Sequence, residues 1–265
     1  MTVFKEDLFS GQTTFVVGGT SGINLGIAEA MGKLGSKIFV VSRSQDKVVA
    51  AISRLTEMGI EADGFSADVR DYDAIYQAAR TCSEKFGDID NVISGAAGNF
   101  VSPAEQLTSN GFKTVVDIDL VGTFNVCRAA FDFVNKKGAA MINISAVQAF
   151  TPMVGQAHVC AAKAGIEALT KVLAIEWGSK SIRVNAIAPG AVGETEGMRR
   201  LTPTKEHEER YMKHIPLGRY AKIEEVADTA IFLCSSAGDN FTGEVVVCDG
   251  GQSILGGGGF KEAWS

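Results

Sequence analysis

The chain has 265 residues, of which 46% are hydrophobic and 21% charged, and its formal net charge at pH 7 is −6. This composition is typical of a folded globular chain, and the acidic charge without a dense Lys/Arg block argues against nucleic acid or a membrane as partner. The five cysteines are scattered without CxxC spacing. We therefore expect free core thiols, a reducing cytoplasmic compartment and no metal site.

The first predicted unit is a strand, a glycine turn and a helix over residues 14–35. An apolar run at 15–17 stops at Gly18, and apolar residues at helical spacing follow from Ile27 to Leu34. Gly18 and Gly22 would let the backbone come close to a ligand, and the unpaired N–H groups of the helix start suit a pyrophosphate. The alternative is a glycine-rich turn that binds nothing.

The rest of the chain alternates strands with helices. The strands are apolar throughout, which is typical of a parallel sheet covered on both faces. We expect one doubly wound, Rossmann-like α/β domain over 1–265, with a seven-stranded, mainly parallel sheet, a substrate lid at 195–215 and a flexible tail at 256–265. The further strands are expected at 37–42, 64–68, 91–94, 139–145, 183–188 and 244–248, and the helices at 46–58, 71–86, 111–135, 157–177, 204–213 and 223–235.

Short motifs lie at the predicted strand ends and helix starts. They are Gly18-Gly19-Thr20-Ser21-Gly22-Ile23, Asp68-Val69, Ala96-Ala97-Gly98, Ser145, Lys163, and Pro189-Gly190-Ala191-Val192 running on to Thr195. In this order the chain resembles the short-chain dehydrogenase/reductase family over almost its full length. The resemblance implies that the first turn holds the pyrophosphate of a nicotinamide cofactor and that Asp68 contacts its adenine. It also implies that Lys163 bonds the nicotinamide ribose, while the segment from Pro189 to Thr195 holds the carboxamide side.

The cofactor region departs from the family pattern at two places. Asn24 stands where the family turn has its third glycine, and Ser94 and Gly95 replace the usual paired asparagines. At the end of the second strand, an acid would bind the ribose hydroxyls of NAD. This chain has Arg43 and Ser44 there, which favours a 2′-phosphate and therefore NADP; the alternative is an exposed arginine that makes no contact.

The family's usual proton donor is missing. It is a tyrosine four residues before the lysine, and here that position is Val159. Reduction of a ketone places negative charge on one oxygen, which needs a proton from a positioned acid. Valine cannot supply that proton, so the site is either inactive or carries out different redox chemistry.

Four segments, at 96–100, 117–119, 122–126 and 193–200, resemble the 2,4-dienoyl-CoA reductases, most closely the peroxisomal type, which also lacks the tyrosine. In that chemistry hydride from NADPH adds to the remote end of a diene, and hydrogen bonds stabilise the charge on the thioester oxygen. A proton then goes to carbon and gives a 3-enoyl-CoA. The resemblance assigns its delivery, through an ordered water, to Asp119, with Lys163 adding positive field. The alternatives are a solvated or capping carboxylate at a helix kink and a surface salt-bridge lysine.

The same resemblance implies an acyl-CoA site, with Asn99 and Ser145 near the thioester, although Ser145 could equally cap a turn. His158 is expected to be a packed or hydrogen-bonded structural residue. A homotetramer is implied, built by pairing the helices at 111–135 and 157–177. The acyl-CoA site would be lined by Arg70, Phe100, Thr108, Ser109, Asn110 and Arg200.

The alternative functions are a carbonyl or 3-oxoacyl reductase with a relocated acid and an inactive NADP-binding protein.

Overall fold

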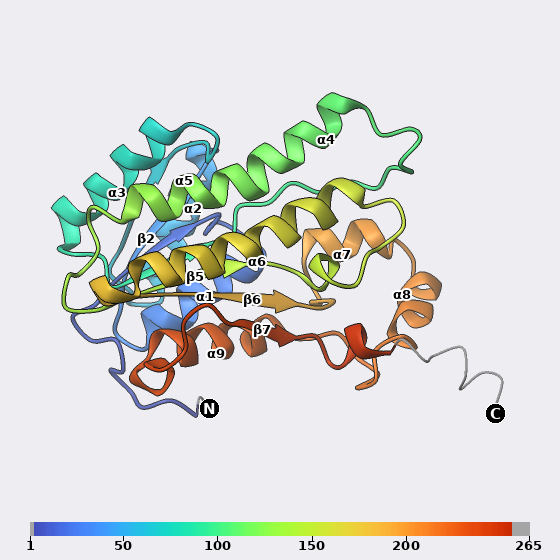
Figure 1. The fold of residues 1–265 in the computed structure, drawn as a ribbon. Helices are drawn as coiled ribbons and strands as arrows, with labels where there is room; N and C mark the ends of the chain where they lie inside the picture. The colour runs from blue at the N-terminus through green and yellow to red at the C-terminus, as the bar shows by residue number, and fades with distance from the viewer. Residues whose placement is uncertain (1–2, 256–265) are drawn as a thin grey trace.

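A computed structural model describes residues 3–255, apart from the side chain of Arg200. Within these residues one seven-stranded sheet has the order β3-β2-β1-β4-β5-β6-β7, and all its strand pairs are parallel (Figure 1). The Rossmann-like prediction is thereby confirmed, and the predicted tail lies outside the described residues. The strands are β1 Thr13–Val17, β2 Lys37–Ser42, β3 Ala62–Ser66, β4 Asn91–Ser94, β5 Ala139–Ile144, β6 Ile182–Pro189 and β7 Val245–Cys248.

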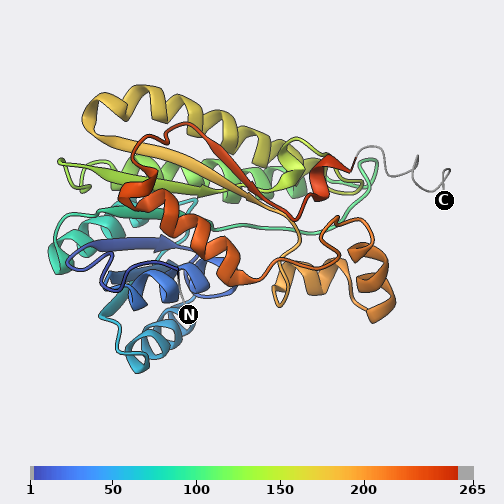
Figure 2. The same cartoon turned by 90° about the horizontal axis from the view of Figure 1, so that it is seen from below.

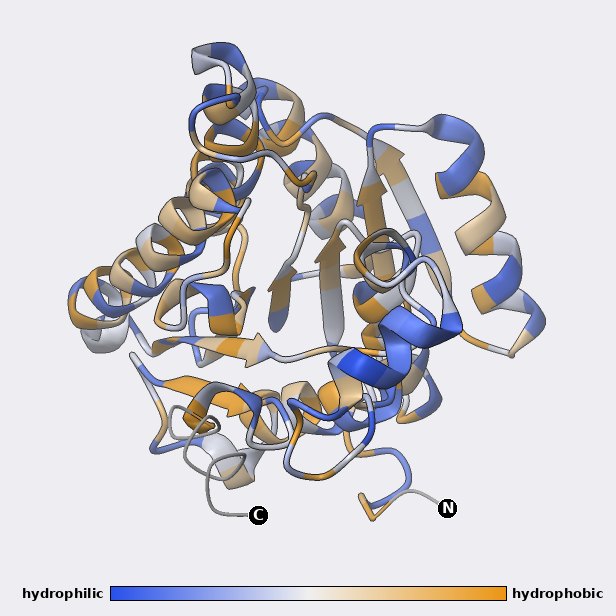
Figure 3. Ribbon diagram, turned by 90° about the vertical axis from the view of Figure 1, so that its right-hand side faces the viewer, coloured by the Kyte–Doolittle hydropathy of each residue, from blue (hydrophilic) through white to orange (hydrophobic). Residues whose placement is uncertain are grey.

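Helices cover both faces of the sheet (Figures 1 and 2). Successive side chains of a strand point to opposite faces of the sheet, so each face has its own hydrophobic core. Phe15 packs with α3, α5 and α6 on one face, and Val16 packs with α1, α2 and α9 on the other. Figure 3 shows the largely hydrophobic strands between helices of mixed character. The helices are α1 Gly22–Lys33, α2 Gln45–Glu57, α3 Tyr72–Phe86, α4 Ser109–Val116, α5 Gly122–Ala130, α6 Ala157–Trp177, α7 Glu196–Leu201, α8 Lys205–Met212 and α9 Ile223–Cys234.

The long helix predicted over 111–135 is present, but it runs over residues 109–130 and is not α-helical throughout. A π-helical turn, Asp117–Val121, separates α4 from α5, and the N–H of Gly122 reaches back to the carbonyl of Asp117. Gly122 lies so close to the preceding strand–helix loop that a Cβ there would stand 2.7 Å from Val69. Apolar periodicity cannot reveal one extra residue in a helical turn, and such turns are frequent at functional sites.

The segment beyond β6 contains two short helices where one was predicted. Thr195 caps α7, with its hydroxyl accepting from the N–H of Met198 at 3.3 Å. Both helices lie beyond the carboxyl ends of the central strands (Figures 1 and 2), and Met198 and Ile215 form a small separate core with Ala191. No helix of the described part is long and apolar enough to cross a membrane.

Candidate active site

The turn between β1 and α1 has the backbone geometry of a phosphate cradle. Gly18 has φ +78°, and a Cβ there would stand 2.8 Å from the backbone nitrogen of Ala96. Gly22 has φ +55°, and within the described residues no atom lies within 4 Å of its Cβ position and Ser21 makes no side-chain capping bond to α1. Open space therefore faces unpaired N–H groups at the start of a 12-residue helix, which fits the pyrophosphate of a dinucleotide. Thr20 lies in the same turn, and Ile23 is the second residue of α1.

The two departures from the family pattern lie against each other. The Asn24 amide nitrogen donates to the carbonyl oxygen of Gly95 at 2.8 Å. A Cβ at Gly95 would stand 2.4 Å from both the nitrogen and the oxygen of that amide. The side chain that Gly95 lacks is thus replaced by one reaching from α1, and the first turn of α1 is tied directly to the end of β4.

At the outer strand ends, two residues predicted to have separate roles are paired. Arg70 donates to the two carboxylate oxygens of Asp68 at 3.0 and 2.6 Å, and this hydrogen bonding lowers the pKa of Asp68. Val69 between them is buried. Arg43 is exposed after β2, and Ser44 caps α2 by accepting from the N–H of Lys47.

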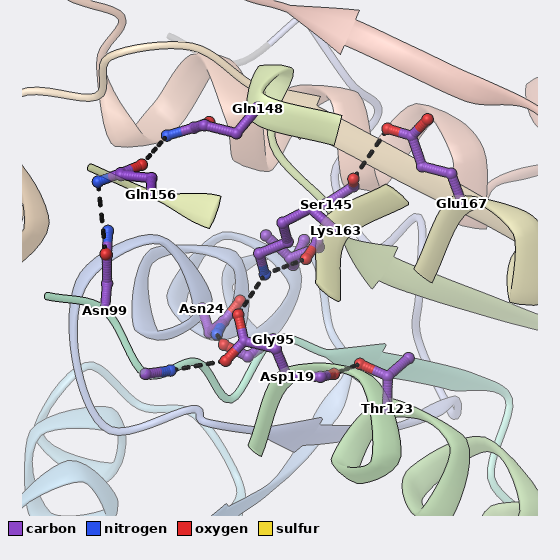
Figure 4. A network of polar contacts seen from close by, with 12 residues as sticks. Asn24, Gly95, Asn99, Asp119, Thr123, Ser145, Gln148, Gln156, Lys163 and Glu167 are labelled. Carbon is purple, nitrogen blue, oxygen red and sulfur yellow. Dashed lines mark hydrogen bonds and ion pairs between the residues drawn. The ribbon is translucent and has the colours of Figure 1, made fainter. Parts of the chain in front are cut away.

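Asp119 lies in the π-helical turn and is fully buried. One carboxylate oxygen accepts from the N–H of Gly98 at 2.7 Å, and the other lies 3.3 Å from the Lys163 ammonium (Figure 4). Thr123 fixes the turn by donating to the Asp119 carbonyl oxygen at 2.6 Å. The alternative of a solvated carboxylate is therefore wrong. That alternative also expected an irregular helix at Asp119, and the π-helical turn is such an irregularity.

Lys163 is a buried residue of α6 and not a surface salt-bridge partner. Its ammonium donates to the carbonyl oxygen of Ile144, at the end of β5, at 3.0 Å. Val159 is also buried, one turn earlier on the same helix. The structure thus joins Asp119 and Lys163 into one charged pair between the π-helical turn and α6.

Ser145 does not join this pair. Its hydroxyl donates to a carboxylate oxygen of Glu167 at 2.9 Å and points away from Asp119 (Figure 4). Burial raises the pKa of Glu167. The catalytic role of Ser145 stays a prediction, and the observed contact is neither that role nor the turn cap given as its alternative.

Three consecutive residues after β4 each contact a different part of the site. Gly98 holds Asp119; Asn99 accepts from the Gln156 amide at 3.4 Å; and the Phe100 ring lies 4.3 Å from the ring of His158, centroid to centroid. Gln148 extends this line of amides by donating to Gln156 at 3.2 Å (Figure 4). Sequence reasoning missed Gln156, because nothing in the chain marks a residue just before a helix as a partner of Asn99.

The loop after β6 is fixed by close packing and by hydrogen bonds. A Cβ at Gly190 would stand 2.7 Å from that of Asp249. The N–H of Ala191 donates to the Gln252 side chain at 3.3 Å, and Thr195 donates to the Val192 carbonyl oxygen at 2.8 Å. Pro189 ends β6 immediately before this loop.

The residues predicted to line the acyl-CoA site come from three parts of the chain, and Arg70, described above, lies in the loop between β3 and α3. Thr108 caps α4 by accepting from the N–H of Gly111 at 3.0 Å, and the exposed Ser109 and Asn110 begin that helix. Phe100 lies on the same side, because a Cβ at Gly111 would stand 3.2 Å from its ring. Arg200 is part of α7, but its side chain lies outside the described part of the structure.

Comparison with known proteins gives a consistent result. Residues 17–253 match the family model described as enoyl-(acyl carrier protein) reductase. A curated protein of Arabidopsis thaliana, named peroxisomal 2,4-dienoyl-CoA reductase [(3E)-enoyl-CoA-producing], is 40% identical over 94% of this chain and 86% of its own.

Two solved structures are similar over nearly their whole length. A short chain dehydrogenase from Bacillus anthracis is 37% identical, with a TM-score of 0.81 over 91% of this chain and 96% of its own. A gluconate 5-dehydrogenase from Burkholderia cenocepacia, in complex with NADP and tartrate, is 27% identical, with a TM-score of 0.88 over 94% of this chain and 98% of its own.

Proposed function

The chain belongs to the short-chain dehydrogenase/reductase family, and from this premise we propose that it is an NADPH-dependent reductase of 2,4-dienoyl-CoA thioesters. The observation that carries the proposal is the buried pair of Asp119 with Lys163, where Lys163 belongs to a helix that has Val159 in place of a phenol. The relative from Arabidopsis thaliana, whose name states this activity, supports it. A conjugated thioester is the substrate class that can accept hydride without a proton on oxygen.

The cofactor is proposed to be NADP(H). Gly18, Gly22 and the start of α1 would hold its pyrophosphate, and Arg43 with Ser44 at the end of β2 would hold a 2′-phosphate. The NADP complex of the relative from Burkholderia cenocepacia supports this choice. When bound, NADPH supplies the hydride that enters the remote end of the diene.

Asp119 and Lys163 divide the remaining chemistry between them. The Lys163 ammonium places a positive charge in a buried region, where the field of a charge is weakly screened. Asp119 is held by the N–H of Gly98 and by Lys163, and we propose that it directs a proton, through one water, to the α-carbon of the dienolate. The product is a 3-enoyl-CoA, which has gained one hydride and one proton.

Absorbance-monitored oxidation of NADPH tests the activity. We expect turnover of a 2,4-dienoyl-CoA and none of a simple ketone. Asp119→Asn keeps the acceptor for Gly98 but removes the carboxylate, and should lower kcat by about 10²–10⁴-fold. The matched control is Asp117→Asn, because Asp117 lies in the same turn but pairs with Lys113 at the surface. A wild-type rate in Asp119→Asn, or turnover of the ketone alone, would refute the proposal.

The location and assembly are proposed to be cytoplasmic and homotetrameric. All five cysteines are free, which fits a reducing compartment, although the name of the Arabidopsis thaliana relative places that protein in peroxisomes. Ile175 of α6 is 83% exposed and Phe124 of α5 45% exposed, and both lie on helices that the homotetramer would pair. Sedimentation of Ile175→Glu should show smaller species than the tetramer expected of the wild type.

A further inference from the structure

His158 is a buried polar side chain without a partner. The residue has no exposed surface, and neither ring nitrogen has a hydrogen-bond partner within residues 3–255. A neutral imidazole carries one donor and one acceptor, and leaving both unmade inside a protein is costly. A partner from outside the chain would remove that cost.

The helix turn that carries His158 also has unused donors. α6 begins directly after Gln156, and no side chain of residues 3–255 caps it. The first N–H of the helix with an acceptor is that of Cys160, which donates to the Gln156 carbonyl oxygen at 2.8 Å. The N–H groups of residues 157–159 come before it and have no acceptor in the described part of the chain. A 21-residue helix adds the positive end of its dipole at this point.

Both features lie at the side of the molecule where the chemistry is proposed. α6 follows β5 and starts at the carboxyl edge of the sheet (Figure 1). Side chains of a helix lean toward its N-terminus, so the imidazole leans toward the unused N–H groups. Phe100, 40% exposed, covers His158, and Gly98, two residues before it, holds Asp119.

We propose that the first turn of α6, together with the imidazole of His158, binds the carbonyl oxygen of the acyl thioester and stabilises the negative charge that develops on it. The inference rests on the proposed function. The first turn of α6 and His158 would supply the stabilisation that a phenol at position 159 would otherwise give. N–H donors aimed at the oxygen stabilise a dienolate without transferring a proton. The Phe100 ring shifts from His158 when the thioester enters.

Binding of two ligands tests the contact without catalysis. Calorimetry in the presence of NADP+ compares hexanoyl-CoA with S-hexyl-CoA, a thioether that lacks only the carbonyl oxygen. We expect the wild type to bind the thioester at least about tenfold more tightly, and His158→Phe, which keeps a ring against Phe100, to reduce this preference strongly. Equal wild-type affinities would overturn the inference alone, whereas no binding of either ligand would overturn the proposed function.

Kinetics and stability separate substrate contact from a structural role. In His158→Phe, kcat for a dienoyl-CoA should fall about 10²-fold with NADPH affinity unchanged, and His158→Gln, which restores an N–H donor, should recover part of the loss. The Tm of His158→Phe should be unchanged or higher, because two unpaired polar atoms are removed. A lower Tm or failure to fold, or a wild-type kcat, would overturn the inference.

Discussion

The amide of Asn24 occupies the space that a side chain at position 95 would need. It donates to the Gly95 carbonyl oxygen at 2.8 Å and stands 2.4 Å from where a Cβ at Gly95 would lie. The contact joins the phosphate turn to the strand end that leads to Gly98 and Asp119. Asn24 and Gly95 each depart from the family pattern, and in the structure the two departures complement each other.

This complementarity predicts a strong coupling between substitutions. Gly95→Ala alone should destabilise the protein by about 1–3 kcal/mol, because the new methyl overlaps a buried amide. Asn24→Gly combined with Gly95→Ala should recover most of this loss. Urea unfolding of the single and double variants measures the coupling. Gly178→Ala is the control, because no atom of the described part of the chain lies within 4 Å of its Cβ position. Additive effects of the two changes would contradict the pairing.

The Asp119–Lys163 pair should affect stability and catalysis in different ways. Lys163→Met leaves a buried carboxylate without its cation and should cost about 3–5 kcal/mol of unfolding free energy. Adding Asp119→Asn removes the unpaired charge, so the double variant should regain stability but not activity. Denaturant unfolding and NADPH oxidation on the same preparations check this. A double variant no more stable than Lys163→Met would show that the two charges do not interact.

Arg70 offers a test of how the CoA moiety is bound. Its guanidinium is paired with Asp68 but remains partly exposed, so it can also meet a phosphate. Arg70→Met should raise KM for a dienoyl-CoA about tenfold, since a hydrogen bond to a charged group is worth about 1.5–3 kcal/mol. The matching N-acetylcysteamine thioester has no phosphate and should show no such change. A similar KM increase for both substrates would show that Arg70 acts only through Asp68.

Stability in acid should depend on the start of α9. Arg219 and the Lys222 N–H both donate to the Glu225 carboxylate and lower its pKa to about 2. A depressed carboxyl pKa stabilises the fold above the unfolded value of 4.5, and this contribution is lost as the pH falls from there through about 2. The pair is exposed, so screening by solvent keeps the effect small.

Arg219→Met should remove most of this pH dependence. The Glu225 resonance, followed by NMR, should titrate closer to 4.5, and the acid unfolding midpoint should move to higher pH. An unchanged Glu225 titration would show that the backbone N–H alone sets its pKa.

The sheet was predictable because its signals are local. Apolar runs such as Phe15–Val17 and Asn91–Ser94 end at small residues, and their strands lie within about two residues of the expected positions. The roles of Asp119 and Lys163 were expected only through resemblance, and their pairing was not predicted. The burial of the pair depends on a π-helical turn that the continuous helical pattern over 111–135 conceals.

Long-range contacts between side chains left no signal in the sequence. Asn24 reaches Gly95 across 71 positions, and Gln156 reaches Asn99 across 57. Ser145 occupies the strand end that the motif predicts, but its hydroxyl donates to Glu167 of α6, a contact across 22 positions. Residue identity thus indicated the chemistry available at the strand ends, while the directions of the side chains required the fold.

The site of protonation tests the central claim most directly. A 2,4-dienoyl-CoA reduced by NADPH in D2O, with the product analysed by NMR, reports where the proton goes. We predict a 3-enoyl-CoA carrying one deuterium on its α-carbon, formed by the wild type and not at a comparable rate by Asp119→Asn. A product with the carbonyl reduced, or with the diene intact after NADPH has been consumed, would contradict the account.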